Sequence, residues 1–301
     1  MITLTFLGTS SMVPTKERNV QSIFLKFKAE GMLIDCGEGT QRQMNIAGIN
    51  RNEITKILIS HWHGDHVSGL IGLIQTMGNS GSDTLVIYGP LGTKEYFGNL
   101  MRSCIFDSKM NIRVEELNPA HNEALTFFED EDFALECVQL SHSVPCLGYA
   151  FIEKDRRRID LDKAKQHGLK EGPLLGKVQQ GQSIMHEGKH ILAEEVTYLV
   201  EGKKVAFILD TEPCEGCLLI AENADVLVSE SSFSSNLTHK AEEFRHMTAK
   251  DAALIAQEAG VKKLILTHFS QRYKTVEEVL DEAKTIFPET EAAYDFMKVK
   301  L

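Results

Sequence analysis

The sequence lacks any long apolar run. No stretch of its 301 residues approaches the roughly 18 consecutive apolar residues of a membrane-spanning helix. Nor does the chain open with a basic segment followed by an apolar one. We therefore expect neither a membrane span nor a secretory signal, and we expect a cytoplasmic protein that does not act at a membrane.

Cysteine is sparse, and positive charge is in deficit. In a reducing compartment we expect the six scattered cysteines to be free thiols. Cys214 and Cys217 form a C-x-x-C pair without a partner pair, which favours a structural role over a metal or redox role. The net charge of −11 counts against a generic nucleic-acid binder, unless basic residues gather on one element.

One segment reverses this charge balance. Residues 153–181 carry eight basic and five acidic residues, a difference of +3 that leaves −14 for the remainder. The segment is rich in glycine and poor in β-branched residues, so it is interpreted as an insertion that protrudes from the core. A solvated loop of mixed charge is the alternative.

Hydrophobic periodicity predicts both strands and helices along the chain. Strands are expected at 2–7, 21–28, 32–34, 56–59, 85–88, 133–140, 204–209, 226–229, 263–267 and 294–300. Helices are expected at 40–47, 67–77, 95–101, 217–223, 248–259 and 275–287. Because helices alternate with strands while several strands are consecutive, we predict an α/β fold, a four-layer αββα sandwich. Residues 1–301 would form one domain, with 153–181 as an inserted arm.

The densest chemical signal is the run His61-Trp62-His63-Gly64-Asp65-His66. Three of the chain's 11 histidines fall within these six positions. Imidazole and carboxylate groups are ligands that suit zinc and similar ions. If the run is an extended turn, His61 and His63 face one side, and Asp65 and His66 reach a second centre. Histidines that merely end a strand are the alternative.

Three later residues could complete such a site. His142, Asp210 and His268 each follow a predicted strand, and a sheet delivers the side chains at its strand ends to a common edge. Each is weak evidence alone. Together with the first cluster they supply ligands for two metals, with Asp210 between them.

The pattern H-x-H-x-D-H followed by distant H, D and H resembles the metallo-β-lactamase superfamily. Further segments resemble one family within it, tRNase Z (ribonuclease Z), the endonucleases that trim the 3′ trailer from precursor tRNA. These segments are the P-x-K-x-R-N loop at Pro14 to Asn19, the glycine-proline element at Gly172-Pro173, the H-S-T loop at His246-Met247-Thr248, and the T-H-x-S-x-R-Y end at Thr267 to Tyr273. One position departs: Ser229 stands where the family's H-E-A-T-F segment begins with histidine.

The resemblance implies a metal-dependent endoribonuclease. It implies two Zn²⁺ per subunit, with Mn²⁺ or another divalent ion possible, which can activate water and hold phosphate oxygens. His61, His63 and His142 would hold one ion. Asp65, His66 and His268 would hold the other, with Asp210 bridging. Asp65 would also act as a base, and His246, oriented by Glu230, would protonate the leaving ribose 3′-oxygen.

The resemblance also implies how RNA is held. Substrate contacts are expected from Lys16, Arg18, Gly172, Pro173, Ser270, Arg272 and Tyr273. The chain is expected to form a homodimer in which one subunit's arm holds the tRNA bound at the other subunit's metals. Two rivals stay open: a small-molecule phosphodiesterase or sulfatase of the same superfamily, and a non-catalytic binding protein of this fold. The arm and loop favour tRNA, and the complete ligand set favours an enzyme.

Overall fold

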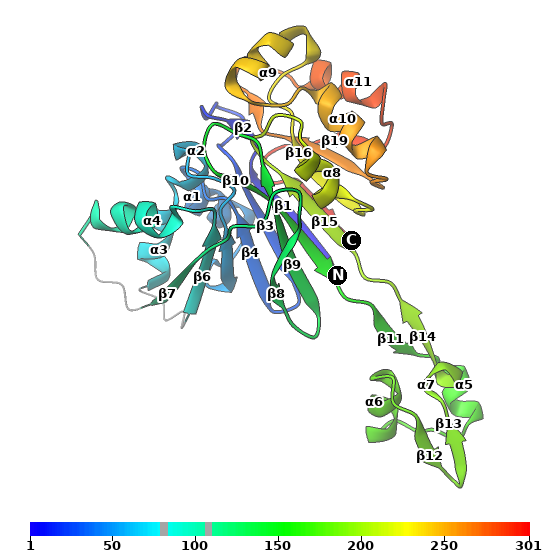
Figure 1. Cartoon of the computed structure of the whole chain (residues 1–301). Coiled ribbons are helices and arrows are strands. Elements are labelled where there is room, and N and C mark those ends of the chain that lie inside the picture. The colour runs from blue at the N-terminus through cyan, green and yellow to red at the C-terminus, as the bar shows by residue number, and fades with distance from the viewer. Residues whose placement is uncertain (79–83, 106–109) are drawn as a thin grey trace. The chain divides into compact units, whose positions relative to one another are not determined.

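The computed structural model describes residues 1–78, 84–105 and 110–301 (Figure 1). These residues divide into two compact units. Unit 1 contains residues 1–128, 135–151 and 204–301, and unit 2 contains residues 129–134 and 152–203. None of the helices within the described ranges has the length and apolar character needed to cross a membrane.

The first large sheet of unit 1 is built mainly from the N-terminal half of the chain. Its strands β4 to β7 run parallel to one another, whereas β3 pairs antiparallel with β1 and β4. Across the sheet the order is β20 (Lys298–Lys300), β1 (Ile2–Gly8), β3 (Ser22–Phe27), β4 (Glu30–Ile34), β5 (Ile54–Leu58), β6 (Thr84–Gly89) and β7 (Asn111–Glu116).

The second large sheet is built from later segments. Its strands β15, β16, β17 and β19 are mutually parallel. Across the sheet the order is β19 (Thr290–Ala292), β17 (Leu264–Thr267), β16 (Val226–Glu230), β15 (Lys204–Ile208), β10 (Cys146–Glu153), β9 (Phe133–Leu140) and β8 (Leu125–Glu129). Short strands β2 (Ser10–Ser11) and β18 (Phe269–Ser270) form a parallel pair that joins the two halves of the unit.

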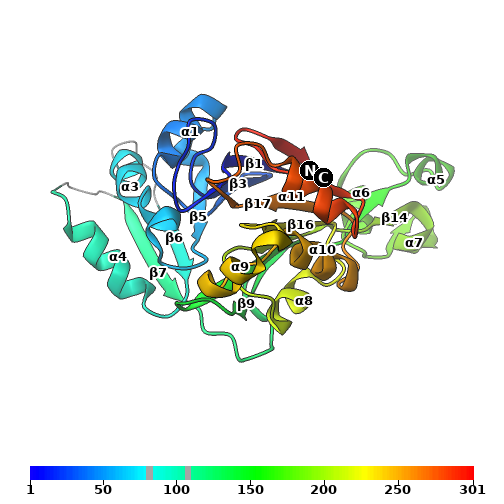
Figure 2. The same ribbon diagram turned by 90° about the horizontal axis from the view of Figure 1, so that it is seen from above.

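Helices cover the outer faces of both sheets (Figure 2). Helices α1 (Thr40–Ala47), α3 (Leu70–Gly78) and α4 (Thr93–Arg102) lie against the first sheet, and α8 (Glu215–Ala221), α10 (Ala249–Glu258) and α11 (Glu277–Lys284) lie against the second. Between the sheets, the rings of Phe27 and Phe151 meet edge to face at 5.2 Å. The predicted αββα sandwich is confirmed, because each sheet buries one face on the other sheet and one on helices.

The structure corrects two predicted elements. The helix expected over 67–77 is two helices, α2 (Gly64–Val67) and α3, because the chain turns at Gly69. The Gly69 amide donates to the Cys36 carbonyl at 2.9 Å, and a side chain there would lie 2.1 Å from the Gly37 carbonyl oxygen. The strand expected over 294–300 is confined to β20, because Asp295 turns inward and accepts a hydrogen bond from the Asn19 amide at 2.8 Å.

Unit 2 has a small core of its own. It contains the antiparallel pairs β11 (Arg156–Ile159) with β14 (Thr197–Val200) and β12 (Ile184–His186) with β13 (Lys189–Ile191). Helices α5 (Leu161–Gln166), α6 (Pro173–Gln179) and α7 (Ala193–Val196) complete it. Its buried core residues are Ala164, Leu169, Leu175, Val178, Ile184, Ile191, Ala193 and Val196. The predicted arm, 153–181, lies within this unit, which continues to Lys203.

Candidate metal centre

Parallel strands of both sheets end at one edge of unit 1. Asp35 follows β4, His61 lies three residues after β5, Asp210 two after β15, and His268 directly after β17. All four side chains are buried. Asp35, Asp210 and His268 have positive φ angles of 56°, 39° and 59°, so the chain turns sharply as it leaves each strand. Such backbone conformations are uncommon outside glycine, and they gather where a structure over-determines the position of a functional side chain.

The first group of possible ligands is His61, His63, His142 and Asp210. His61 Nε2 and His63 Nδ1 are 2.9 Å apart, and His142 Nε2 is 3.3 Å from the same His63 atom. Asp210 Oδ2 lies 3.7 Å from His61 Nε2. Three imidazoles and a carboxylate thus direct one atom each toward a common point.

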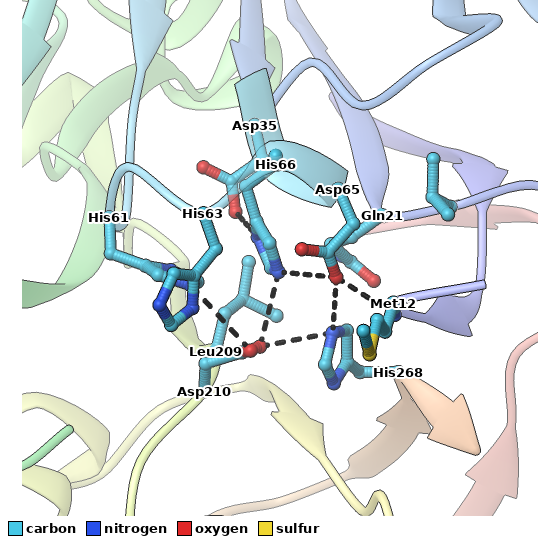
Figure 3. A network of polar contacts seen from close by, with 12 residues as sticks. Met12, Gln21, Asp35, His61, His63, Asp65, His66, Leu209, Asp210 and His268 are labelled. Carbon is cyan, nitrogen blue, oxygen red and sulfur yellow. Dashed lines mark hydrogen bonds and ion pairs between the residues drawn. The ribbon is translucent and has the colours of Figure 1, made fainter. Parts of the chain in front are cut away.

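The second group is Asp65, His66 and His268 (Figure 3). His66 Nε2 lies 3.3 Å from Asp65 Oδ2, and His268 Nε2 lies 3.6 Å from it. Asp210 faces this group as well, with Oδ1 3.4 Å from His66 Nε2 and 3.1 Å from His268 Nε2. Asp210 therefore stands between the two groups, with one carboxylate oxygen toward each.

Buried polar atoms without partners test whether this arrangement fits metal ions. His66 Nε2, His268 Nε2 and Asp210 Oδ1 are buried and have no hydrogen bond of good geometry to any described residue. An unsatisfied buried polar group costs about 1–3 kcal/mol, so convergence of three such atoms needs a cause. Cation ligation is that cause, because these atoms carry the lone pairs that imidazole and carboxylate offer to divalent metals.

The Nδ1 atom of each buried histidine in the two groups points away from the proposed metal and contacts another residue. The outer ring nitrogens lie within hydrogen-bond distance of fixed partners: His61 Nδ1 at 3.0 Å from Ser60 Oγ, His66 Nδ1 at 2.6 Å from Asp35 Oδ2, His142 Nδ1 at 3.0 Å from the Arg245 carbonyl, and His268 Nδ1 at 3.0 Å from Ser232 Oγ. Such partners orient metal-ligating imidazoles. Sequence reasoning missed Asp35, Ser60 and Ser232; the position of Asp35 after a strand, like that of Asp210, was an available signal.

The charge states of His61, Asp65 and Asp210 suit metal binding. Burial lowers the pKa of His61 well below its usual value, so the ring is neutral and its lone pair is free. Burial opposes ionisation of Asp210, but the charges of His268 and His66 hold its pKa well below the usual range. Asp65 behaves alike: burial is outweighed by the charge of His66, and its pKa is also well below normal. Burial lowers the pKa of His66, but the carboxylates around it, Asp210 first, raise that pKa well above its usual value, so this ring must release a proton when a cation binds.

Glu230 and His246 form a hydrogen-bonded pair beside the two groups. His246 Nδ1 lies 2.9 Å from Glu230 Oε1, and its other nitrogen, Nε2, lies 4.0 Å from Asp210 Oδ2. Burial lowers the pKa of His246, but the charges of Glu230 and Asp210 outweigh it and raise that pKa to about 9. His246 is therefore protonated at neutral pH. Ser229 stands where the family's H-E-A-T-F segment begins with histidine. It is buried in β16, where its hydroxyl donates to the Glu230 carbonyl at 3.0 Å.

A cavity of about 730 Å³ opens over the two groups. Its lining includes Ser270 and Arg272, two of the predicted substrate contacts, and the exposed apolar side chains of Met12 and Phe244. The Met12 amide also donates to Asp65 Oδ2 at 2.8 Å. The cavity joins a polar floor to an apolar rim, which suits a ligand that has both a phosphate and flat rings.

The other predicted substrate residues lie in different settings. Arg18 Nη2 donates to the Tyr273 carbonyl at 2.6 Å, and the Tyr273 hydroxyl is buried and accepts from the Ser234 amide at 2.8 Å. Arg18 and Tyr273 thus tie the loop at Pro14 to Asn19 to the segment after His268. Lys16 is exposed in the same loop, and Gly172 and Pro173 are exposed at the start of α6 in unit 2.

Comparisons with known proteins include one match to the first half of the chain and several to its full length. Residues 2–157 match the model of the family described as "Anti-Pycsar protein Apyc1". A protein named Ribonuclease Z from Methanothermobacter thermautotrophicus is 44% identical over 100% of this chain and 97% of its own length. The human tRNase Z short form (ELAC1) superposes with a TM-score of 0.74 and 27% identity, covering 99% and 98% of the two chains. YhfI of Bacillus subtilis, a metallo-β-lactamase fold protein, matches in fold with a TM-score of 0.70, 20% identity and coverage of 99% and 98%.

Proposed function

The chain belongs to the ribonuclease Z family, and its first half also to the family described as anti-Pycsar protein Apyc1; we propose that it removes the 3′ trailer of precursor tRNA and leaves a tRNA 3′-hydroxyl. It is a metal-dependent endoribonuclease. The match to the second family ends at residue 157, before Asp210, Glu230, His246 and His268. The relatives that cover these residues are named Ribonuclease Z, so the small-molecule alternative is not favoured.

The convergence of six ligand side chains around a seventh, the shared Asp210, carries the proposal. We propose two divalent ions, zinc by the ligand types, with Mn²⁺ as an alternative. When bound, they would supply an activated water and neutralise charge on the phosphate. His61, His63 and His142 would hold one, and Asp65, His66 and His268 the other.

Two residues of the chain would carry out the proton transfers, one as a base and one as an acid. Asp65, fixed by the Met12 amide, faces the cavity as the base that orients the attacking water. The leaving ribose 3′-oxygen is a poor leaving group, so it gains from a proton. His246 Nε2 provides that proton, because Glu230 occupies Nδ1 and leaves Nε2 directed toward the cavity.

RNA is held at a second place in this proposal. Unit 2 presents exposed basic side chains, among them Arg156, Arg158, Lys170 and Lys177, beside the exposed Gly172-Pro173 element. These positive charges suit the phosphate backbone of a folded tRNA. We further propose a homodimer in which unit 2 of one copy serves the metal centre of the other. The proposed location is the cytoplasm, because precursor tRNA is an intracellular transcript.

The decisive experiment is incubation with a precursor tRNA that bears a 3′ trailer. We expect one cut, directly after the discriminator base, that is lost in Asp65→Ala and after chelation and returns when metal is restored. Asp281→Ala, an exposed carboxylate on α11, is the matched control and should cleave normally. Cleavage that persists in Asp65→Ala, or cuts spread along the RNA, would refute the proposal.

A further inference from the structure

Cys214 and Cys217 lie where β15 leads into α8, and their sulfur atoms are 3.6 Å apart. Cys214 is half-buried, whereas Cys217 is buried. Because β15 and β16 are parallel, the pair stands at the strand-to-helix turn of a β–α–β unit. A C-x-x-C pair near such a unit is typical of redox proteins. The proposed RNA cleavage uses neither thiol.

We propose that Cys214 and Cys217 are a redox-active dithiol that exchanges with the disulfides of small thiols, with Cys214 attacking and Cys217 resolving. The sequence pattern alone favours a structural role. The sulfur contact, with only one of the two thiols reachable from solvent, favours exchange, because a small disulfide can meet Cys214 first and Cys217 then lies within reach.

The surroundings of the two thiols differ in the direction that this reaction needs. The hydrogen bond from the Cys217 thiol lowers the pKa of Cys214 to about 6; burial opposes it, and the Cys217 and Ser141 amides assist it. The same hydrogen bond, together with burial, raises the pKa of Cys217 well above its usual value. At neutral pH Cys214 is therefore the thiolate, which is the nucleophilic form, and Cys217 keeps its proton.

The exchange takes two steps. The Cys214 thiolate attacks one sulfur of a disulfide RSSR, forming a Cys214–SR bond and releasing RS⁻. Cys217 then gives its proton to RS⁻ and attacks the Cys214 sulfur, which forms the Cys214–Cys217 bond and expels a second RS⁻ that takes a proton from water. In sum, two protein thiols lose two electrons, and RSSR gains them as two RSH.

The loop that carries Cys214 also holds the segment of His142. Thr211 Oγ1 accepts from the Ser141 amide at 3.0 Å, and the Glu212 amide donates to the Ser141 carbonyl at 2.9 Å. Ser141 directly precedes His142, a proposed metal ligand. A disulfide bond of about 2.05 Å requires the two sulfurs to approach by roughly 1.5 Å. Oxidation therefore moves the Cys214 sulfur, which lies 3.9 Å from Thr211 Oγ1, the acceptor of the Ser141 amide.

The test uses the full-length, metal-loaded protein and oxidised glutathione. Intact mass and peptide mapping should show a Cys214–Cys217 disulfide in the wild type, with no glutathione retained on either residue. Cys217→Ser should instead trap one glutathione on Cys214. If serine at this buried position unfolds the protein, Cys217→Ala provides the same test. Cys104→Ser, which removes an exposed and solitary thiol, should behave as the wild type.

A second readout rests on the proposed function. Cleavage of precursor tRNA by the oxidised enzyme should fall roughly tenfold, as when the support of a metal ligand is disturbed, and dithiothreitol should restore it. Stable glutathione on wild-type Cys214, or no reaction there, would overturn the dithiol proposal whatever the enzyme cleaves. A disulfide that leaves cleavage unchanged would overturn the link to His142.

Discussion

Ionisable side chains are arranged differently in the two units. At the edge of unit 1 they are buried and fixed: Asp210 is 3% exposed and His268 is 1% exposed. In unit 2, Lys170 and Lys177 are exposed on the surface around α6. Fixed buried groups suit chemistry at one point, because they need no reorganisation during the reaction. Exposed basic groups suit diffuse contact with phosphates. Substitutions in the two units should therefore separate turnover from binding.

The largest expected effect is a loss of kcat in a unit 1 variant that still binds RNA. His246→Ala should lower kcat for precursor tRNA by about 10²- to 10⁴-fold, because it removes a general acid. It should change the hydrolysis of bis(p-nitrophenyl) phosphate little, because p-nitrophenolate leaves without a proton. His239→Ala, an exposed histidine on α9 (Thr238–Phe244), is the control. Equal losses of RNA affinity and RNA cleavage would sink the proton-donor role.

A smaller effect is expected in unit 2, where substitutions should weaken RNA binding and leave the chemistry at the metal centre intact. Deleting 156–177 would remove β11 and α5 from the core of unit 2, so a surface change is the sharper test. Lys170→Glu with Lys177→Glu should lower kcat/KM for precursor tRNA roughly tenfold. The slope of log binding constant against log salt concentration should become shallower by about two, one for each lysine that no longer meets a phosphate. Hydrolysis of the small phosphodiester should not change. Lys298→Glu with Lys300→Glu, on β20, applies the same charge change to unit 1.

Mixing the two kinds of variant tests whether unit 2 acts across a dimer. The lysine variant keeps its metal centre, and His246→Ala keeps its basic unit 2. If the units cooperate between copies, each mixed dimer has one working combination, and an equimolar mixture should recover about a quarter of wild-type activity, since half of the dimers are mixed. If each copy serves its own metal centre, the mixture should show only the residual activity of the lysine variant.

The smallest expected effect is a shift in the pH profile of kcat, which reports on the proton donor of unit 1. His246 must be protonated to act as an acid, so activity is lost as the pH rises through its pKa. The charge of Glu230 is the largest of the causes that raise that pKa. Glu230→Gln should therefore move the basic limb of the kcat profile to lower pH, by about one unit or more. A limb that stays in place would assign it to another group.

How far the sequence predicts the site depends on whether the contacts are local. His61 to His66 meet within six positions, so spacing alone indicates a metal site there. His142, Asp210 and His268 are separated by 126 positions in sequence, and strand ends indicate them only as candidates. Asp35 and Ser232 are harder to predict, because they act by fixing the rings of His66 and His268, and only the position of Asp35 after a strand points to a role.

The sequence by itself determined the αββα layering and the metal motif, because hydrophobic periodicity and close spacing are local properties. Only the tertiary structure decided that Asp210 stands between the two ligand groups, because this requires two sheets to bring their strand ends to one edge. It also decided that Cys214 and Cys217 are in sulfur contact, with Cys214 half-buried and Cys217 buried. A C-x-x-C spacing permits that contact, but the turn that closes it depends on how β15, α8 and Ser141 pack together.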